Sequence, residues 1–152
     1  DYSSHSGDTA WWNGEGDPST GYFKGGIDNR LITTPIDLTN AKTAELSAYF
    51  KFNINTKDGR PPDGFRVEIS TNNGVSWEAI NIGSRTASGV ADWIAAENLY
   101  RLNVDLSDFS GNTILLRFRV VTNNVQNHYE VKSTDGGFYV DDVVISGETI
   151  QG

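Results

Sequence analysis

Two adjacent carboxylates, Asp141 and Asp142, stand in a setting that suggests chemistry. They interrupt an otherwise apolar segment, Phe138 to Ile145, that has the composition of a strand. Side chains alternate across a strand, so in either register one Asp shares a face with part of the apolar set. A lone buried carboxylate is costly unless it is paired or bound to a metal. The pair therefore predicts either a cation site or bonds to backbone N–H groups or arginines of neighbouring segments.

The composition favours a hard cation. The chain has 152 residues, 20 of them acidic and 12 basic, for a net charge of −8. It has only two histidines, without zinc spacing, and no cysteine. Oxygen ligands favour calcium over zinc. The same negative charge argues against a nucleic-acid partner, whose phosphates would be repelled.

Catalytic motifs are missing from the sequence. It contains no HExxH segment of a zinc protease and no G-x-S-x-G segment of a serine hydrolase. Its many carboxylates leave a glycosidase pair possible in principle, but no spacing marks one. We therefore expect a protein without enzymatic activity.

Adjacent tryptophans form a second feature with chemical potential. Trp11 and Trp12 would point to opposite faces of a strand, one to the core and one outward. The outward ring could stack on a sugar or a protein partner, and Tyr22 could join it. The alternative is that these aromatic side chains only cover the ends of the fold. The first interpretation predicts a carbohydrate-binding module.

Strands must position these residues, because period-2 patterns dominate the sequence. The clearest segments are residues 46–54, 65–70 and 114–120, in which apolar and polar side chains alternate. We expect an all-β fold, a two-sheet antiparallel β-sandwich of jelly-roll type with about eight strands. Strict alternation in the last strand would place Phe138, Val140 and Val144 on one face and Tyr139, Val143 and Ile145 on the other.

One hairpin has a recognisable turn. The segment STNNGVSW has the pattern S-x-N-x-G-x-S-W, from Ser70 to Trp77. A short polar side chain at Asn72 can bond backbone amides across the turn, and Gly74 can take a positive φ. We expect this hairpin to be structural, and the pattern, which is similar to an Asp box, does not indicate sialidase activity.

Five phrases in order give a family resemblance. They are SHSGDTAWWNGEGD, IDNRLITTPIDLTNAKTAELSAYFKF, VEISTNNGVSWEAI, VDLSDFSGNTILLRFRVVT and GGFYVDDVVISG. Together they resemble the MAM-like jelly-roll domains of secreted bacterial peptidases of the immune-inhibitor-A type, and in plan the cleaved-adhesin domains of gingipains. The resemblance implies a non-catalytic accessory or adhesion module, secreted or at the cell surface and attached to a protease.

The resemblance also implies a structural Ca²⁺ that joins the last strand to the N-terminal segment. The matching positions in this sequence are, in order of preference, Asp142, Asp141, Asp8 and Asp28. The expected partners are a protein or glycan at the cell surface or in the extracellular matrix, neighbouring domains, or like subunits.

The chain is expected to be one domain, residues 1–152, processed or excised from a larger secreted chain because it starts at Asp1 and lacks methionine. No apolar run is long enough for a membrane span. Compared with the family, the segment before the HSG phrase is short, so a first strand is missing or comes from elsewhere. A missing strand would leave a sheet edge open, so a subunit that self-assembles by strand addition is a third hypothesis.

Overall fold

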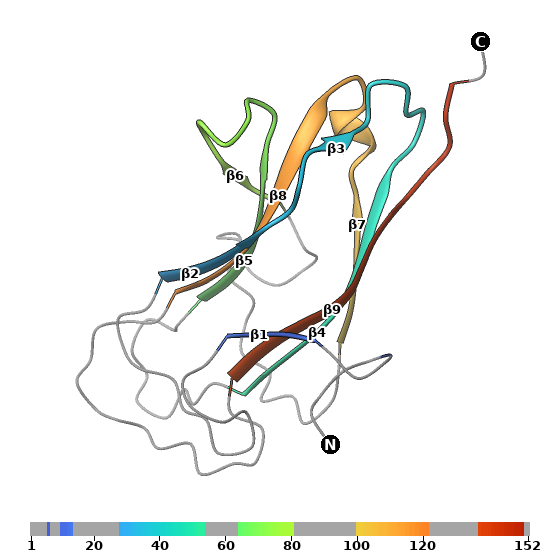
Figure 1. Ribbon diagram of the computed structural model, residues 1–152. Coiled ribbons are helices and arrows are strands. Elements are labelled where there is room, and N and C mark those ends of the chain that lie inside the picture. The colour runs from blue at the N-terminus through green and yellow to red at the C-terminus, as the bar shows by residue number, and fades with distance from the viewer. Residues whose placement is uncertain are drawn as a thin grey trace.

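Two antiparallel sheets form the fold in a computed structural model that describes residues 6, 10–13, 28–53, 64–80, 100–121 and 137–150 (Figure 1). The strands in these residues are β1 (Trp11–Asn13), β2 (Asp28–Ile32), β3 (Ile36–Asp37), β4 (Glu45–Asn53), β5 (Gly64–Ser70), β6 (Glu78–Ala79), β7 (Tyr100–Asp105), β8 (Thr113–Val121) and β9 (Gly137–Ser146). A 3₁₀ turn, Ser107–Phe109, lies between β7 and β8. The predicted all-β class is confirmed.

The sheet topology is that of a jelly roll. One sheet has the order β1-β9-β4-β7, and the other has the order β2-β8-β5-β6 with β3 also paired to β8. All pairs are antiparallel. Most neighbours in a sheet are distant in sequence, because the chain crosses repeatedly from one sheet to the other. This crossing is the arrangement of a double-sheet jelly roll.

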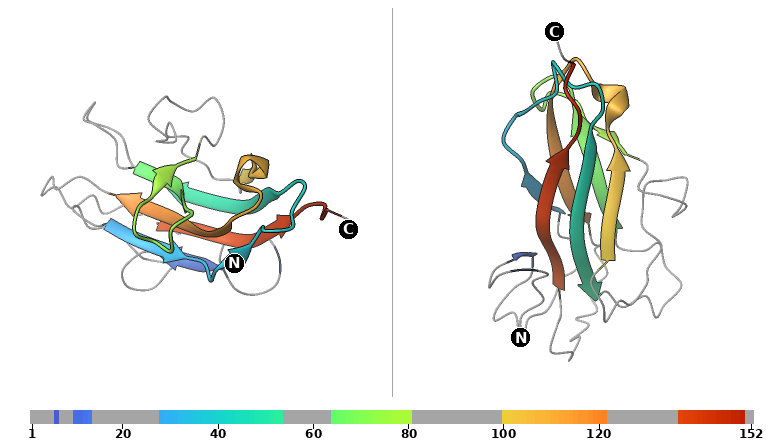
Figure 2. Two further views of the ribbon diagram at one scale, coloured as in Figure 1. Left: turned by 90° about the horizontal axis from the view of Figure 1, so that it is seen from above. Right: turned by 90° about the vertical axis from the view of Figure 1, so that its right-hand side faces the viewer.

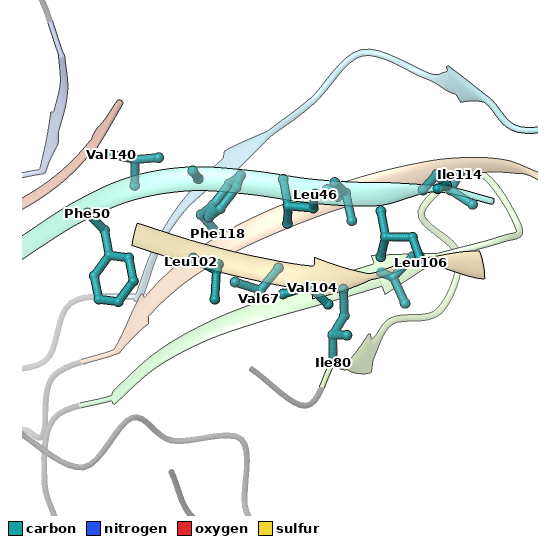
Figure 3. Close-up of a cluster of buried hydrophobic side chains, with 14 of the residues drawn as sticks. Leu46, Phe50, Val67, Ile80, Leu102, Val104, Leu106, Ile114, Phe118 and Val140 are labelled. Carbon is teal, nitrogen blue, oxygen red and sulfur yellow. The ribbon is translucent and has the colours of Figure 1, made fainter. Parts of the chain in front are cut away.

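The core fills the space between the sheets and comes from the predicted alternation. Leu46 and Phe50 point inward from β4, on the same side as Val67 of β5 (Figure 3). Ala48 and Ile69 belong to the same buried cluster. From β8, the inward side chains are Ile114, Leu116, Phe118 and Val120, each at most 1% exposed. Alternating buried side chains of this kind supply most of the free energy that stabilises a sandwich.

The last strand breaks the predicted alternation. Ser47 of β4 faces Val144, while Tyr49 faces Asp141, so one β4 residue lies opposite two residues of β9. This is a β-bulge, and Asp142 adopts a positive φ of 46° within it. As a result Val140 and Ile145 contact the core, whereas Val144 is half exposed. The prediction that Val140 and Val144 share a face is therefore wrong, because the extra residue reverses the faces after it.

The predicted hairpin turn between β5 and β6 is confirmed. The Asn72 side chain accepts a hydrogen bond from the Ser76 backbone N–H (2.9 Å) and donates to the Ser76 hydroxyl (2.8 Å). Gly74 has a φ of 83°, and its carbonyl accepts a hydrogen bond from the Trp77 indole (3.1 Å). The turn is thus closed by its own side chains, which is a structural role.

Candidate functional site: the outer face of the four-stranded sheet

The Asp141–Asp142 pair lies at the bulge, where it meets Ser6. The Ser6 hydroxyl donates to Oδ1 of Asp142 (2.7 Å), and the Ser6 N–H donates to Oδ2 of Asp141 (3.3 Å). The backbone N–H of Asp142 donates to Oδ1 of Asp141 (2.8 Å). Both carboxylates are half-buried. The bulge thus removes the need to bury a carboxylate in the core, which answers why an apolar strand carries two acids.

These donors and acceptors allow two descriptions of the acidic pair. In the first description, two backbone N–H groups donate hydrogen bonds to the Asp141 carboxylate, which is the predicted alternative to a cation site. Ser6, Asp141 and Asp142 also bring three oxygen-bearing side chains together, and Ca²⁺ takes six to eight oxygen ligands. In the part of the chain described, no group of three or more His, Cys, Asp or Glu side chains is placed to hold a metal ion. Asp8 lies outside the described residues, so the calcium prediction stays a prediction.

Asp28 lies on the other sheet and has arginine partners. Its carboxylate accepts hydrogen bonds from Arg119 (2.7 and 3.0 Å) and from Arg30 (2.6 Å). Hydrogen bonds from Arg119 and then Arg30 hold the pKa of Asp28 well below its ordinary value. The described contacts of this carboxylate are therefore ion pairs, and they do not bring it to Asp141 and Asp142. Its predicted role as a calcium ligand is not tested by them.

The two tryptophans divide between the faces of β1 as predicted. Trp11 lies opposite Val140 and packs against the core. Trp12 lies opposite Tyr139, and the two rings stack with centroids 6.3 Å apart and planes inclined by 29°. Tyr139 is buried outside the core cluster, whereas Trp12 is half-buried. Tyr139 therefore supports the Trp12 ring on the outer face of the sheet. Tyr22 lies outside the described residues.

A row of hydrogen-bonding side chains continues this face. Tyr49 of β4 lies directly opposite Asp141 on β9 and Arg101 on β7. Residues directly opposite in antiparallel strands share a face. Side chains alternate along a strand, so Tyr49 points outward between the buried Ala48 and Phe50. Figure 2 shows the order of β9, β4 and β7 in this sheet. We call the surface made by Trp12, Tyr49, Arg101 and Asp141, which is backed by the buried Tyr139, the aromatic face.

This surface combines the two kinds of contact that sugar recognition needs. An aromatic ring can stack against the apolar side of a sugar, and carboxylate, guanidinium and phenol groups can bond its hydroxyls. Arg101 is exposed, and it has no ion pair among the described residues. The sequence indicated the two tryptophans but not Tyr49 and Arg101, because their place beside Asp141 depends on the strand register.

The outer face of the five-stranded sheet carries a different cluster. Arg117 forms an ion pair with Glu68 (2.5 Å), and the two side chains are only 10% and 7% exposed. The Trp77 ring covers this pair, with the Arg117 guanidinium carbon 4.2 Å from the ring centroid. Arg119 joins the cluster through Glu68 (3.5 Å). Alternation along the strands predicts that these charged side chains point away from the core, but it does not show that they shield one another from solvent.

Comparisons with known proteins assign no family to this chain. No protein-family model matches the chain, and no curated protein matches it. Among solved structures, one match is the CBM22-2 xylan-binding domain of Xyn10C from Paenibacillus barcinonensis, with 15% identity and a TM-score of 0.38. The match covers 73% of this chain and 65% of that domain, less than two thirds of its length. A likeness this low carries no argument about the chain, and the MAM-like resemblance stays a prediction.

Proposed function

We propose that this protein is a non-catalytic, extracellular module that binds glycans through the aromatic face. The main observation in support is that the Trp12 ring stacks on Tyr139. Next to it on the same face is the row of Asp141, Tyr49 and Arg101. Tyr139 restrains the Trp12 ring before any ligand arrives, which lowers the entropic cost of binding. A sheet face also presents its side chains at regular intervals, which suits an extended sugar chain.

Glycan binding can be tested with matched arginines on opposite sheets. Arg101→Ala removes a hydrogen-bonding group from the aromatic face, and Arg66→Ala removes the same group from β5 of the other sheet. On a broad glycan array, wild type and Arg66→Ala should bind the same glycans, and Arg101→Ala should bind at least about tenfold more weakly. Trp12→Ala should abolish binding. No binding by the wild type, or equal losses from both arginine variants, would contradict the proposal.

We also propose a structural Ca²⁺ at the acidic pair, supported by the approach of Ser6 to both carboxylates. Asp141, Asp142 and the Ser6 hydroxyl would supply part of the ligand set, and Asp8 would supply a further oxygen. A bound ion stabilises the folded state by mass action. A chelator should therefore lower the melting temperature by several degrees, and added calcium should restore it. Asp142→Asn should lose this response, and a melting curve that ignores the chelator would contradict the site.

The wider setting follows from the resemblance alone. It supports an accessory or adhesion role beside a secreted or surface protease. The coding sequence on either side of these residues tests this proposal, because a neighbouring HExxH domain would support it.

No helix among the described residues is both long and apolar enough to cross a membrane.

A further inference from the structure

One side of β9 is paired from end to end apart from the bulge, whereas described residues pair with only part of the other side. β4 pairs with β9 from Glu45 to Asn53, and the pairing continues beyond the strand through hydrogen bonds from Lys42 to Glu148 and from Ile150 to Asn40. On the opposite side, β1 pairs only with residues 138–140 of β9. No described residue pairs with that side from residue 143 onward.

Within the described residues, this free edge has little protection after the bulge. Proteins guard sheet edges with charged residues, prolines, bulges or covering loops, because an open edge can pair with another chain. The bulge of β9 lies at the start of this edge, with Asp142 and Val143 opposite one residue of β4, and residues 143–147 read Val-Val-Ile-Ser-Gly without charge or proline. Val143 and Val144 are 38% and 50% exposed. Beyond the bulge, Val144, Ile145 and Ser146 pair regularly with β4, so the backbone of this edge has the regular strand geometry that pairing with another strand requires.

We propose that residues 143–147 accept an extended strand from another protein, antiparallel to β9 and in line with β1. Antiparallel pairing matches every other pair in the sheet and is the more stable arrangement per residue. The incoming strand would place an apolar side chain beside Val144 and complete the four-stranded sheet along its whole edge. This mode of recognition takes affinity from the backbone and specificity from alternate side chains.

Charge identifies the kind of strand that fits. The free edge is bounded by Asp141 and Asp142 at one end and by Glu148 at the other, in a chain of net charge −8. A second copy of the same edge would bring like charges together, which disfavours self-pairing. The occupant is therefore an apolar, alternating segment of a different protein with basic residues at its ends. The proposal does not rest on glycan binding, because it concerns the backbone edge and not the aromatic face.

The experiment uses isotope-labelled protein and a synthetic probe, a short peptide of alternating valine and threonine with lysine at each end. At about 1 mM peptide, amide resonances of residues 143–147 should shift, and their hydrogen exchange should slow. A peptide with proline at its centre should have no effect, because proline cannot donate to the ladder.

Two matched variants control for charge. Val144→Lys should weaken binding of the peptide by about tenfold or more. Val75→Lys should leave binding unchanged, because Val75 is 85% exposed at the hairpin of the other sheet. The proposal is overturned if the alternating peptide leaves the exchange of residues 143–147 unchanged. It is also overturned if light scattering shows that the protein alone dimerises with these amides protected, since a second copy would then occupy the edge.

Discussion

The buried Glu68–Arg117 pair allows a quantitative prediction about stability. Glu68→Gln preserves the size of the side chain and removes its charge. Arg117 would then keep a guanidinium that is only 10% exposed without its main counter-charge, and Arg119 would lose its contact with the same carboxylate. The substitution therefore tests whether the outer face of the five-stranded sheet depends on paired charges.

The expected magnitude follows from the contacts that remain. Removing one partner of a buried ion pair costs about 3–5 kcal/mol. Here the Trp77 ring stays over Arg117, and such a contact contributes about 1–2 kcal/mol when it is desolvated. The glutamine amide can also still accept a hydrogen bond. We therefore expect the free energy of unfolding to fall by about 3 kcal/mol, which lowers the melting temperature by about 6–12 °C for a domain of this size.

Urea unfolding followed by circular dichroism measures this change. The matched control is Glu148→Gln, because Glu148 pairs with Lys42 (3.2 Å) while both side chains are about two-thirds exposed. An exposed pair contributes less than about 1 kcal/mol. Arg117→Met and the double variant complete a thermodynamic cycle, in which the double variant should lose less stability than the two single losses added together.

Two results would refute the reasoning. The first is a Glu68→Gln protein within about 1 kcal/mol of the wild type, the range expected of an exposed pair. The second is strict additivity in the cycle, since that would mean that Glu68 and Arg117 do not stabilise each other.

Two further predictions concern other contacts. Because Arg119 and Arg30 depress the pKa of Asp28, its contribution is present above the ordinary value of 3.8 and is lost as pH falls below it toward the folded-state pKa. Urea unfolding from about pH 6 to pH 2 should show the stability gap between wild type and Asp28→Asn shrinking below about pH 4, and a constant gap would argue against the ion pairs. Gly147→Ala should lower the melting temperature more than Gly111→Ala, because a Cβ at Gly147 would clash with the Thr43 carbonyl oxygen. At Gly111 a Cβ meets nothing within 4 Å, and only the positive φ opposes it, at about 1 kcal/mol. Equal losses in thermal melts would contradict that assignment.

Alternation predicted the central strands well, because each buries one face. The inward residues of β4, β5 and β8 are those that the pattern selected. The hairpin turn was also predictable, because its hydrogen bonds join residues only a few positions apart. Both signals are local, so neither needs knowledge of which strands pair.

The features that escaped prediction depend on strand register. A single residue in the left-handed region at Asp142 creates the bulge, and nothing in a period-2 pattern announces it. The aromatic face needs Tyr49, Arg101 and Asp141 to be directly opposite one another, and these residues are distant in sequence. The Glu68–Arg117 pair has the same dependence. Sequence patterns show which way a side chain faces within its strand but not what lies opposite it.

The position of β9 in the four-stranded sheet has a consequence for folding kinetics. β9 is paired to both β1 and β4, yet more than eighty residues separate it from either strand in the chain. Bringing together strands that are so distant in sequence costs loop-closure entropy before their contacts stabilise the chain. Topologies dominated by such non-local contacts fold on timescales of about milliseconds to seconds. A nascent chain would thus hold the β4 edge that pairs with β9 unpaired until β9 itself emerges.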